Sequence, residues 1–161
     1  MTSKLHKTNA VRIAHKANIP YILREYDAPT GFLDGVSVAA ATGMNPDQVF
    51  KTLVLQGTSK EYYVCLIPVA AHLHLKKAAK HFGEKKMEMI PAREITKITG
   101  YIKGGCSPVG MKKTFKTAID STGENFEFII VSGGKVGLQM EIELSGLLAL
   151  TDATLTDLTQ D

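Results

Sequence analysis

The sequence contains no tryptophan, only two cysteines and no apolar run long enough to cross a bilayer. A membrane-spanning helix needs about 20 consecutive apolar residues, and the polar N-terminus has no signal-peptide core. Cys65 and Cys106 lack the spacing of a redox pair or of a metal site. Because free thiols are typical of a reducing compartment, we expect a cytoplasmic protein with no disulfide and no membrane partner.

Several catalytic and cofactor-binding motifs are also absent. The sequence has no P-loop, no Gly-x-Gly-x-x-Gly that opens a helix, and no Gly-x-Ser-x-Gly nucleophile elbow. Its five histidines fall on or beside expected helix surfaces. His72 and His74 are spaced for metal binding, but two ligands without a third make a weak site. We therefore expect neither a metal nor another cofactor.

The pattern of apolar residues predicts a single α/β domain over residues 1–161. A chain of this length, 44% hydrophobic and 22% charged, can bury one sizeable core. Helical and strand patterns are interspersed without a βαβ repeat, which predicts a mixed, curled β-sheet flanked by helices. The expected helices are 8–18, 36–42, 75–82, 91–99 and a last one from Ser145; the expected strands are 21–26, 49–55, 62–69, 86–90, 114–120, 126–131 and 138–144; and the tail 151–161 is expected to fray.

Lys51 interrupts the apolar strand at 49–55. Side chains alternate along a strand, so Lys51 shares a face with Leu53 and Leu55. An ammonium on an apolar face costs free energy unless an anion meets it, which indicates a ligand phosphate or carboxylate. The alternative is a lysine at the edge of the strand whose ammonium reaches water. On the strand pattern alone the alternative is favoured, because most lysines in strands are solvated.

Two glycine-rich loops carry further candidate chemistry. Residues 104–110 read Gly-Gly-Cys-Ser-Pro-Val-Gly and residues 132–137 read Ser-Gly-Gly-Lys-Val-Gly. Each combines a hydroxyl with unhindered backbone N–H groups, which can bind an anion or an oxyanion. Taken alone, such a loop is more often simply a tight connection. Cys106 is a candidate nucleophile, but no histidine in its segment can serve as its base. The residues alone fit a binding module as well as an enzyme.

Charge is distributed unevenly along the chain. The net charge is only +3, yet residues 97–116 contain five lysines and no acidic residue, and no basic residue follows Lys135. Such a basic sector fits contact with a polyanion, and it also fits a solvated lysine face. The lysines are Lys97, Lys103, Lys112, Lys113 and Lys116.

Three motifs, at 49–53, 99–113 and 131–137, resemble the YbaK/EbsC family in sequence and order. These proteins are free-standing relatives of the editing domain inserted in bacterial prolyl-tRNA synthetases. Within the family the chain is most similar to the Cys-tRNA(Pro) deacylases. The resemblance implies a barrel-like mixed sheet with flanking helices. It also implies hydrolysis, without a cofactor, of cysteine wrongly attached to proline tRNA, in trans and with prolyl-tRNA synthetase as a further partner. The alternative is a non-catalytic module of this fold that binds tRNA or synthetase.

The resemblance also implies roles for individual residues. Lys51 falls on the essential lysine, which holds the aminoacyl-adenosine end, while the thiol of the substrate's own cysteine attacks the ester carbonyl. Gln139 stands where the deacylases carry an aspartate, so a neutral amide faces the substrate's amino group. The remaining substrate-binding positions are Tyr26, Phe32, Thr52, Gly104, Gly105, Ser107, Pro108, Ser132, Gly133 and Gly134, and the tRNA-binding positions are Lys103, Lys112, Lys113 and Lys116.

The lysine-rich sector generates the first prediction. Changing Lys112 and Lys113 to glutamate should weaken tRNA binding and reduce its dependence on salt, because fewer counterions are released when fewer phosphates are neutralised. The measurement is the slope of the logarithm of the tRNA binding constant against that of salt concentration, with unfolding curves as a control for the fold. A slope equal to that of the wild type would contradict it.

Overall fold

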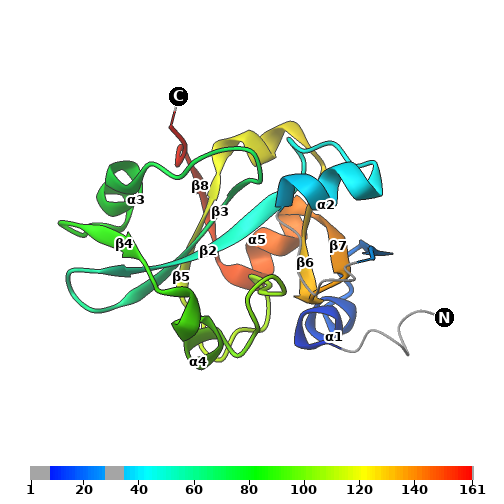
Figure 1. Ribbon diagram of the computed structural model, residues 1–161, viewed down its shortest axis with the longest axis horizontal. Helices are drawn as coiled ribbons and strands as arrows, with labels where there is room; N and C mark the ends of the chain where they lie inside the picture. The colour runs from blue at the N-terminus through cyan, green and yellow to red at the C-terminus, as the bar shows by residue number, and fades with distance from the viewer. Residues whose placement is uncertain (1–7, 28–34, 161) are drawn as a thin grey trace.

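The computed structural model describes residues 8–27 and 35–160, which form a mixed α/β fold (Figure 1). In chain order its elements are α1 (Asn9–Lys16), β1 (Tyr21–Glu25), α2 (Gly35–Thr42), β2 (Phe50–Gly57), β3 (Tyr62–Pro68), α3 (Leu75–Phe82), β4 (Met87–Met89), the short 3₁₀ helix η2 (Ala92–Glu94), α4 (Ile95–Thr99), β5 (Lys116–Asp120), the 3₁₀ helix η3 (Ser121–Asn125), β6 (Phe128–Lys135), β7 (Leu138–Glu143), α5 (Leu144–Thr151) and β8 (Thr154–Thr156). None of the described helices is long and apolar enough to cross a membrane.

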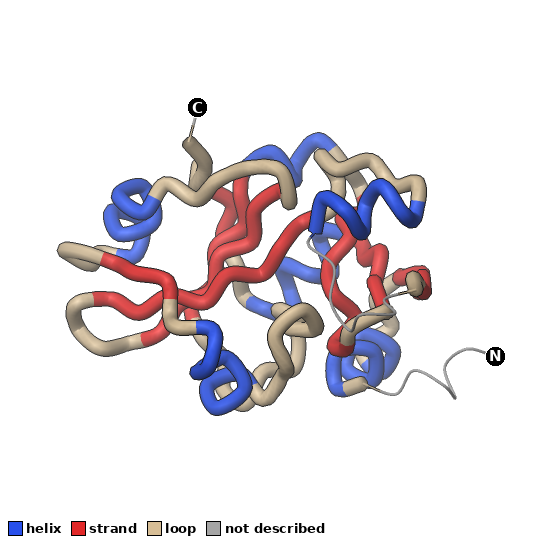
Figure 2. Tube along the Cα trace, in the orientation of Figure 1, coloured by secondary structure: helices blue, strands red, loops and turns tan. Residues whose placement is uncertain are grey.

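Among the described residues the strands form two open sheets (Figure 2). One is antiparallel with the order β1-β7-β6, and the other is mixed with the order β4-β2-β3-β5-β8. They meet at Val49, which makes a parallel bridge to Ile130. The predicted mixed sheet with helices around it is confirmed, whereas closure into a barrel-like sheet is not. Beyond Val49, β2 diverges from β6 and instead pairs with β4.

Local sequence signals explain where the helices start and stop. Thr8 caps α1 by accepting a hydrogen bond from the Val11 N–H, and the buried face of α1 is Ala10, Val11 and Ala14. Helix α3 covers the predicted 75–82 and ends at Gly83, whose φ of 77° is the left-handed conformation that glycine adopts without strain. These two helices pack on different hydrophobic clusters. α1 packs on the cluster that includes buried residues of β6 and β7, and α3 packs on the cluster that includes Leu55 of β2 and Ile67 of β3.

The C-terminal tail is ordered, and the expectation that it frays is wrong. β8 pairs in parallel with β5, and Leu158 beyond it is completely buried. The anchor is Asp120, itself 1% exposed. One of its oxygens accepts from the Leu158 N–H at 2.9 Å, and the other accepts from the N–H and the hydroxyl of Thr122. A polar sequence gave no sign of this, because the partner lies 38 residues away.

The Asp120 anchor generates a stability prediction. Asp120→Ala should lower the free energy of unfolding by about 2–4 kcal/mol, because the N–H groups of Leu158 and Thr122 lose their acceptor in a buried place. Denaturant unfolding measures this. The matched control is Glu88→Ala, whose carboxylate is 71% exposed and pairs with Lys86 at 3.6 Å; it should change stability by less than about 1 kcal/mol. Equal effects of the two substitutions would contradict the conclusion that Asp120 anchors the C-terminal segment.

Candidate functional site

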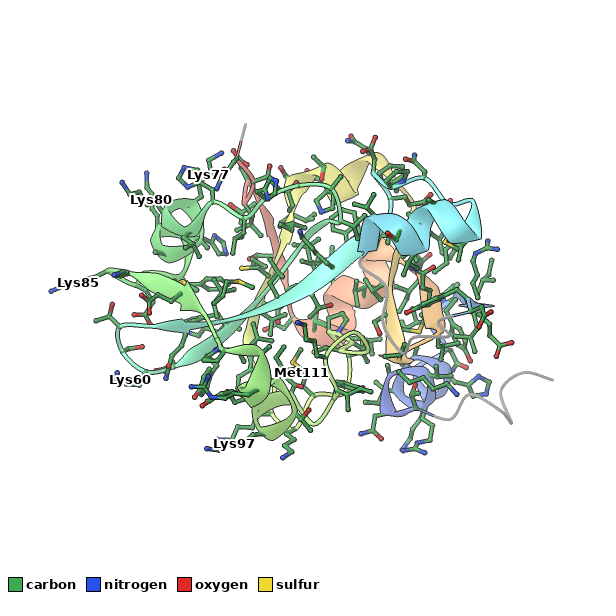
Figure 3. All side chains as sticks on the ribbon, in the orientation of Figure 1. Lys60, Lys77, Lys80, Lys85, Lys97 and Met111 are labelled. Atoms are coloured by element: carbon green, nitrogen blue, oxygen red, sulfur yellow. The ribbon has the colours of Figure 1, made fainter. Side chains whose placement is uncertain are left out.

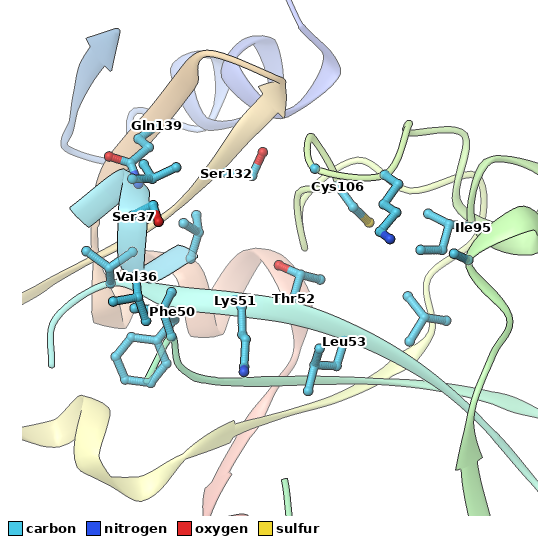
Figure 4. A pocket seen from close by; sticks show the side chains of 18 of the residues that line it. Val36, Ser37, Phe50, Lys51, Thr52, Leu53, Ile95, Cys106, Ser132 and Gln139 are labelled. Atoms are coloured by element: carbon cyan, nitrogen blue, oxygen red, sulfur yellow. The ribbon is translucent and has the colours of Figure 1, made fainter. Parts of the chain in front are cut away.

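The candidate site is a cavity of about 780 Å³ along one edge of β2 (Figure 4). β3 pairs with β2 from Phe50 to Gln56. On the opposite edge β2 is joined to β6 at Val49, and β4 pairs with it only from Leu55 onward. Between these points, no strand among the described residues covers the edge. The cavity opens there and is therefore contacted by side chains from both faces of β2.

Thr52 lies at the centre of this open edge. The Val69 N–H donates to the Val49 carbonyl on the β3 side, and the Ile90 N–H donates to the Val54 carbonyl from the opposite side. Successive residues of a strand direct their backbone groups to alternate sides. Thr52 lies two residues before Val54, so its backbone N–H and C=O point to the same side as those of Val54, away from β3 and toward the open edge.

Lys51 is half-buried on the cavity wall. In Figure 4 its side chain leaves β2 on the same side as Leu53 and on the opposite side to Thr52. Burial lowers the pKa of its ammonium, since desolvation disfavours the charged form. Its ammonium has no hydrogen-bond or ion-pair partner in residues 8–27 and 35–160. A positive charge is thus held at a cavity, where an anionic group of a ligand would stabilise it.

Within residues 8–27 and 35–160, two buried oxygen atoms of cavity-lining residues also lack hydrogen-bond partners. They are Thr52 Oγ1 and Gln139 Oε1, which come from β2 and β7. Gln139 is only 6% exposed. A buried polar atom without a hydrogen bond costs about 1–3 kcal/mol. Both oxygens are buried inside the wall of the cavity rather than exposed at its surface.

The first glycine loop contributes two residues to the cavity and three to packing. Gly104 and Cys106 line the cavity. Gly105 has no room for a side chain, since a Cβ there would lie 2.8 Å from the Lys135 backbone of the second loop. Ser107 and Pro108 are buried away from the cavity, and Ser107 Oγ accepts from the Val109 N–H. Gly105 thus brings the two glycine-rich segments into contact, and Ser107 stabilises its own loop. Contact of Gly105, Ser107 and Pro108 with substrate stays a prediction.

The expected loop at 132–137 is largely strand, because β6 continues to Lys135 with a bulge between Ser132 and Lys135. The residues of this second glycine segment are also divided between lining and packing. Ser132 lines the cavity and accepts from the Gly134 N–H at 3.2 Å. Gly133 and Gly134 instead permit close packing. A Cβ at Gly133 would lie 2.6 Å from Leu138, and one at Gly134, whose φ is 105°, would lie 2.9 Å from Thr8. The loop is thereby fixed against α1 and β7, and Ser132 is positioned at the cavity.

Cys106 is a poor candidate for an enzyme nucleophile. Burial raises the pKa of its thiol to about 11, and hydrogen bonding to Thr99 only partly offsets this. At neutral pH about one molecule in ten thousand would carry the reactive thiolate. No histidine lines the cavity in the described part of the chain. Cys65 is buried in the core, and its pKa is raised to about 12.

One wall of the cavity was not predicted from the sequence. It consists of apolar residues of β4, η2 and α4, with α2 closing the other end. The sequence carries no local signal for this wall; in the structure, large apolar side chains at the rim are exposed, Met89 by 46% and Val36 of α2 by 47%. Predicted Tyr26 does line the cavity, whereas predicted Phe32 lies outside the described residues. The unpredicted lining residues of this wall and of α2 include Val36, Ser37, Met89, Ile90, Ala92 and Ile95.

The predicted tRNA-binding lysines are not gathered in one place. Lys103 lines the cavity, while Lys116 lies in β5 beside a second cavity of about 320 Å³. Lys112 Nζ donates to the Lys97 carbonyl at 3.1 Å, so it also fixes the end of α4. Figure 3 shows other lysines that project outward from α3, from α4 and from the turns before β3 and β4. They include Lys60, Lys80, Lys85 and Lys97. No cluster of three metal-ligating side chains occurs among the residues described.

Comparison with known proteins identifies relatives for nearly the whole chain. Residues 34–150 match the family model described as "Aminoacyl-tRNA editing domain". The chain is 40% identical over 153 residues to the Enterococcus faecalis protein named "Putative Cys-tRNA(Pro)/Cys-tRNA(Cys) deacylase EbsC", which covers 95% of this chain and 93% of that protein.

Solved structures share the fold. The crystal structure of "a putative trans-editing enzyme for prolyl tRNA synthetase" superposes with a TM-score of 0.81 at 24% identity, covering 100% of this chain and 99% of the other. That of a hypothetical protein superposes with a TM-score of 0.83 at 22% identity, covering 94% and 99%. At these identities the likeness shows the fold alone.

Proposed function

The chain belongs to the aminoacyl-tRNA editing domain family, and we propose that it is a trans-acting deacylase that removes cysteine from Cys-tRNA(Pro). One observation carries the proposal. A half-buried lysine without a protein partner lines a cavity that contains no activated nucleophile in the described residues. Residues 1–161 act as one deacylase domain. Prolyl-tRNA synthetase is the partner from which the mischarged tRNA is released.

The size of the cavity supports a substrate larger than an amino acid. A volume of about 780 Å³ lies within the range of about 300–1,000 Å³ that is typical of sites for drug-sized ligands. The aminoacyl group and the terminal adenosine of a charged tRNA fit this range together. In this arrangement the apolar wall of Met89, Ile90 and Ile95 receives the flat face of the base, and the polar residues of β2 and β7 receive the aminoacyl group.

Lys51 acts as the clamp of the ester. Its ammonium binds the aminoacyl-adenosine end and stabilises the negative charge that develops on the carbonyl oxygen. Gly104 lines the same cavity, and its backbone N–H is the second donor in this proposal. Burial makes this ammonium more effective, because the charge is poorly screened and its lowered pKa makes it a stronger acid toward the leaving oxygen.

The substrate supplies the nucleophile. In a cysteinyl ester the side-chain thiolate lies close to its own carbonyl carbon, where its effective concentration is high. Attack forms a carbon–sulfur bond and breaks the bond to the ribose oxygen, which leaves as a hydroxyl after it gains a proton. Water then opens the cyclic thioester and releases cysteine. This route needs orientation and charge stabilisation rather than an enzyme base, which fits the protonated state of Cys106.

Lys51 provides the direct test of this function. Lys51→Ala should reduce single-turnover deacylation of Cys-tRNA(Pro) by about a hundred-fold or more, the usual effect of removing one donor to a developing oxyanion. Lys51→Arg should recover only part of the rate, because a planar guanidinium does not replace a compact ammonium. Lys80→Ala, an exposed lysine of α3 outside the cavity, is the matched control and should stay at the wild-type rate.

Two results would contradict the proposed function. Wild-type protein that binds the charged tRNA without cleaving it would indicate a non-catalytic module. A Lys51→Ala variant as active as Lys80→Ala would remove the clamp from the mechanism.

A further inference from the structure

Thr52 offers the cavity a pair of backbone groups rather than its side chain. On one side of it the Val54 carbonyl already accepts from the Ile90 N–H, and on the other side Phe50 is only 2% exposed beside the joint with β6. The N–H and C=O of Thr52 point away from β3 and have no partner within residues 8–27 and 35–160. Thr52 is partly exposed although its hydroxyl oxygen is buried in the wall. The open edge thus presents one donor and one acceptor on a single strand residue.

An aminoacyl group carries the complementary groups at the same spacing. In an antiparallel sheet, the two residues of a hydrogen-bonded pair exchange both of their N–H···O=C bonds. An α-aminoacyl ester has an N–H donor and a C=O acceptor on either side of one carbon, as a strand residue has. Proteins that bind extended peptides use sheet edges in this way. Because β6 joins β2 at Val49 and β4 joins it at Leu55, the gap suits one aminoacyl residue rather than a longer strand.

Pairing with Thr52 would also direct the two ends of the ligand. Residues that lie opposite each other in a sheet point their side chains to the same face, and the next residues point to the other face. The ligand's side chain would therefore lie on the Thr52 side of β2, where Figure 4 shows Ser132 and Cys106. In an antiparallel arrangement the ester oxygen and the ribose follow the carbonyl toward Lys51, whose side chain leaves β2 on the opposite side. Lys51 is thereby placed toward the ribose end of the ligand.

We propose that the substrate's aminoacyl group binds as a single strand residue on the open edge of β2. Its carbonyl oxygen accepts from the Thr52 N–H, and its amino group donates to the Thr52 carbonyl. The inference rests on the proposed function and adds the contacts that position the ester and stabilise charge on its carbonyl oxygen. These contacts use only atoms common to all α-amino acids. Binding therefore does not select cysteine, and the selection is made by the thiol in the chemical step.

Amide hydrogen exchange tests the contact without any substitution. The probe is 3′-deoxy-3′-(L-alanylamino)adenosine, which has an amide in place of the ester and no thiol. In the free protein the Thr52 N–H should exchange faster than those of Lys51 and Leu53, which by strand alternation point to β3. With saturating probe, exchange should slow at Thr52 by at least about ten-fold more than at Lys51 or Leu53, because a new hydrogen bond forms only there.

An isomeric ligand tests the spacing of the two groups. The β-alanyl probe has the same composition, but an extra carbon separates its amine from its carbonyl, so it cannot form both bonds at once. At about pH 6, where both amines are protonated, the L-alanyl probe should bind at least about ten-fold more tightly. Thr52→Pro removes the N–H at an edge position that faces away from β3 and should reduce this preference to within about three-fold. Thr52→Val, which keeps the N–H, should retain the preference.

The contrary results separate this inference from the function on which it rests. Wild-type protein that cleaves Cys-tRNA(Pro) and binds the L-alanyl probe, yet shows no extra slowing of exchange at Thr52 or binds both isomers equally, overturns the inference alone. Protein that binds neither probe and cleaves no charged tRNA overturns both. If Thr52→Pro does not fold, the exchange measurement and the isomer preference of the wild type still decide the outcome.

Discussion

The incomplete pairing of β2 is the constraint on which the site depends. One edge of this strand is paired with β3 along its length, while the other is joined to β6 at Val49 and to β4 from Leu55. Between these joints lies a strand edge whose backbone groups need partners. Closing the sheets into a barrel would satisfy that edge and remove the cavity. The separation of the two sheets therefore creates the cavity that we propose as the substrate site.

The rest of the molecule holds this edge open. α1 and the second glycine loop pack together at Thr8, whose hydroxyl donates to the Gly133 carbonyl. The backbone at Lys135 of this second glycine segment in turn packs against Gly105 of the first glycine loop, where it leaves no space for a side chain. On the other side, Asp120 fixes the C-terminal segment against η3. A cavity built on such contacts keeps its unpartnered atoms in place before a ligand arrives, which lowers the entropic cost of binding.

Burial sets the chemistry available in the cavity. The same desolvation lowers the pKa of Lys51 and raises that of Cys106 to about 11. Burial therefore makes the Lys51 ammonium a stronger acid, and it keeps the Cys106 thiol of the cavity protonated. In a deacylase this combination directs the reaction toward a nucleophile carried by the substrate.

Much of this arrangement could be predicted from the sequence, and the missing parts share one cause. Helix α3 followed from the spacing of Leu75, Ala78 and Phe82, and Lys51 was marked by the apolar strand around it. Such signals are local. The pairing of β8 with β5 and the apolar wall of Met89 and Ile90 depend on segments far apart in the chain. The glycine loops were recognised, but the division between residues that line the cavity and residues that pack, such as Gly105, depends on the facing backbone.

The central claim is that the protein positions and polarises an ester that the substrate itself cleaves. Single-turnover deacylation of cysteinyl and seryl esters of proline tRNA by the Cys65→Ser, Cys106→Ser double variant tests it most directly. The account predicts that the double variant cleaves the cysteinyl ester within about three-fold of the wild-type rate. It also predicts that both proteins cleave the seryl ester at least about a hundred-fold more slowly, because a hydroxyl is far less acidic than a thiol. A double variant that is folded but inactive would show that the nucleophile belongs to the enzyme, and it would contradict the account.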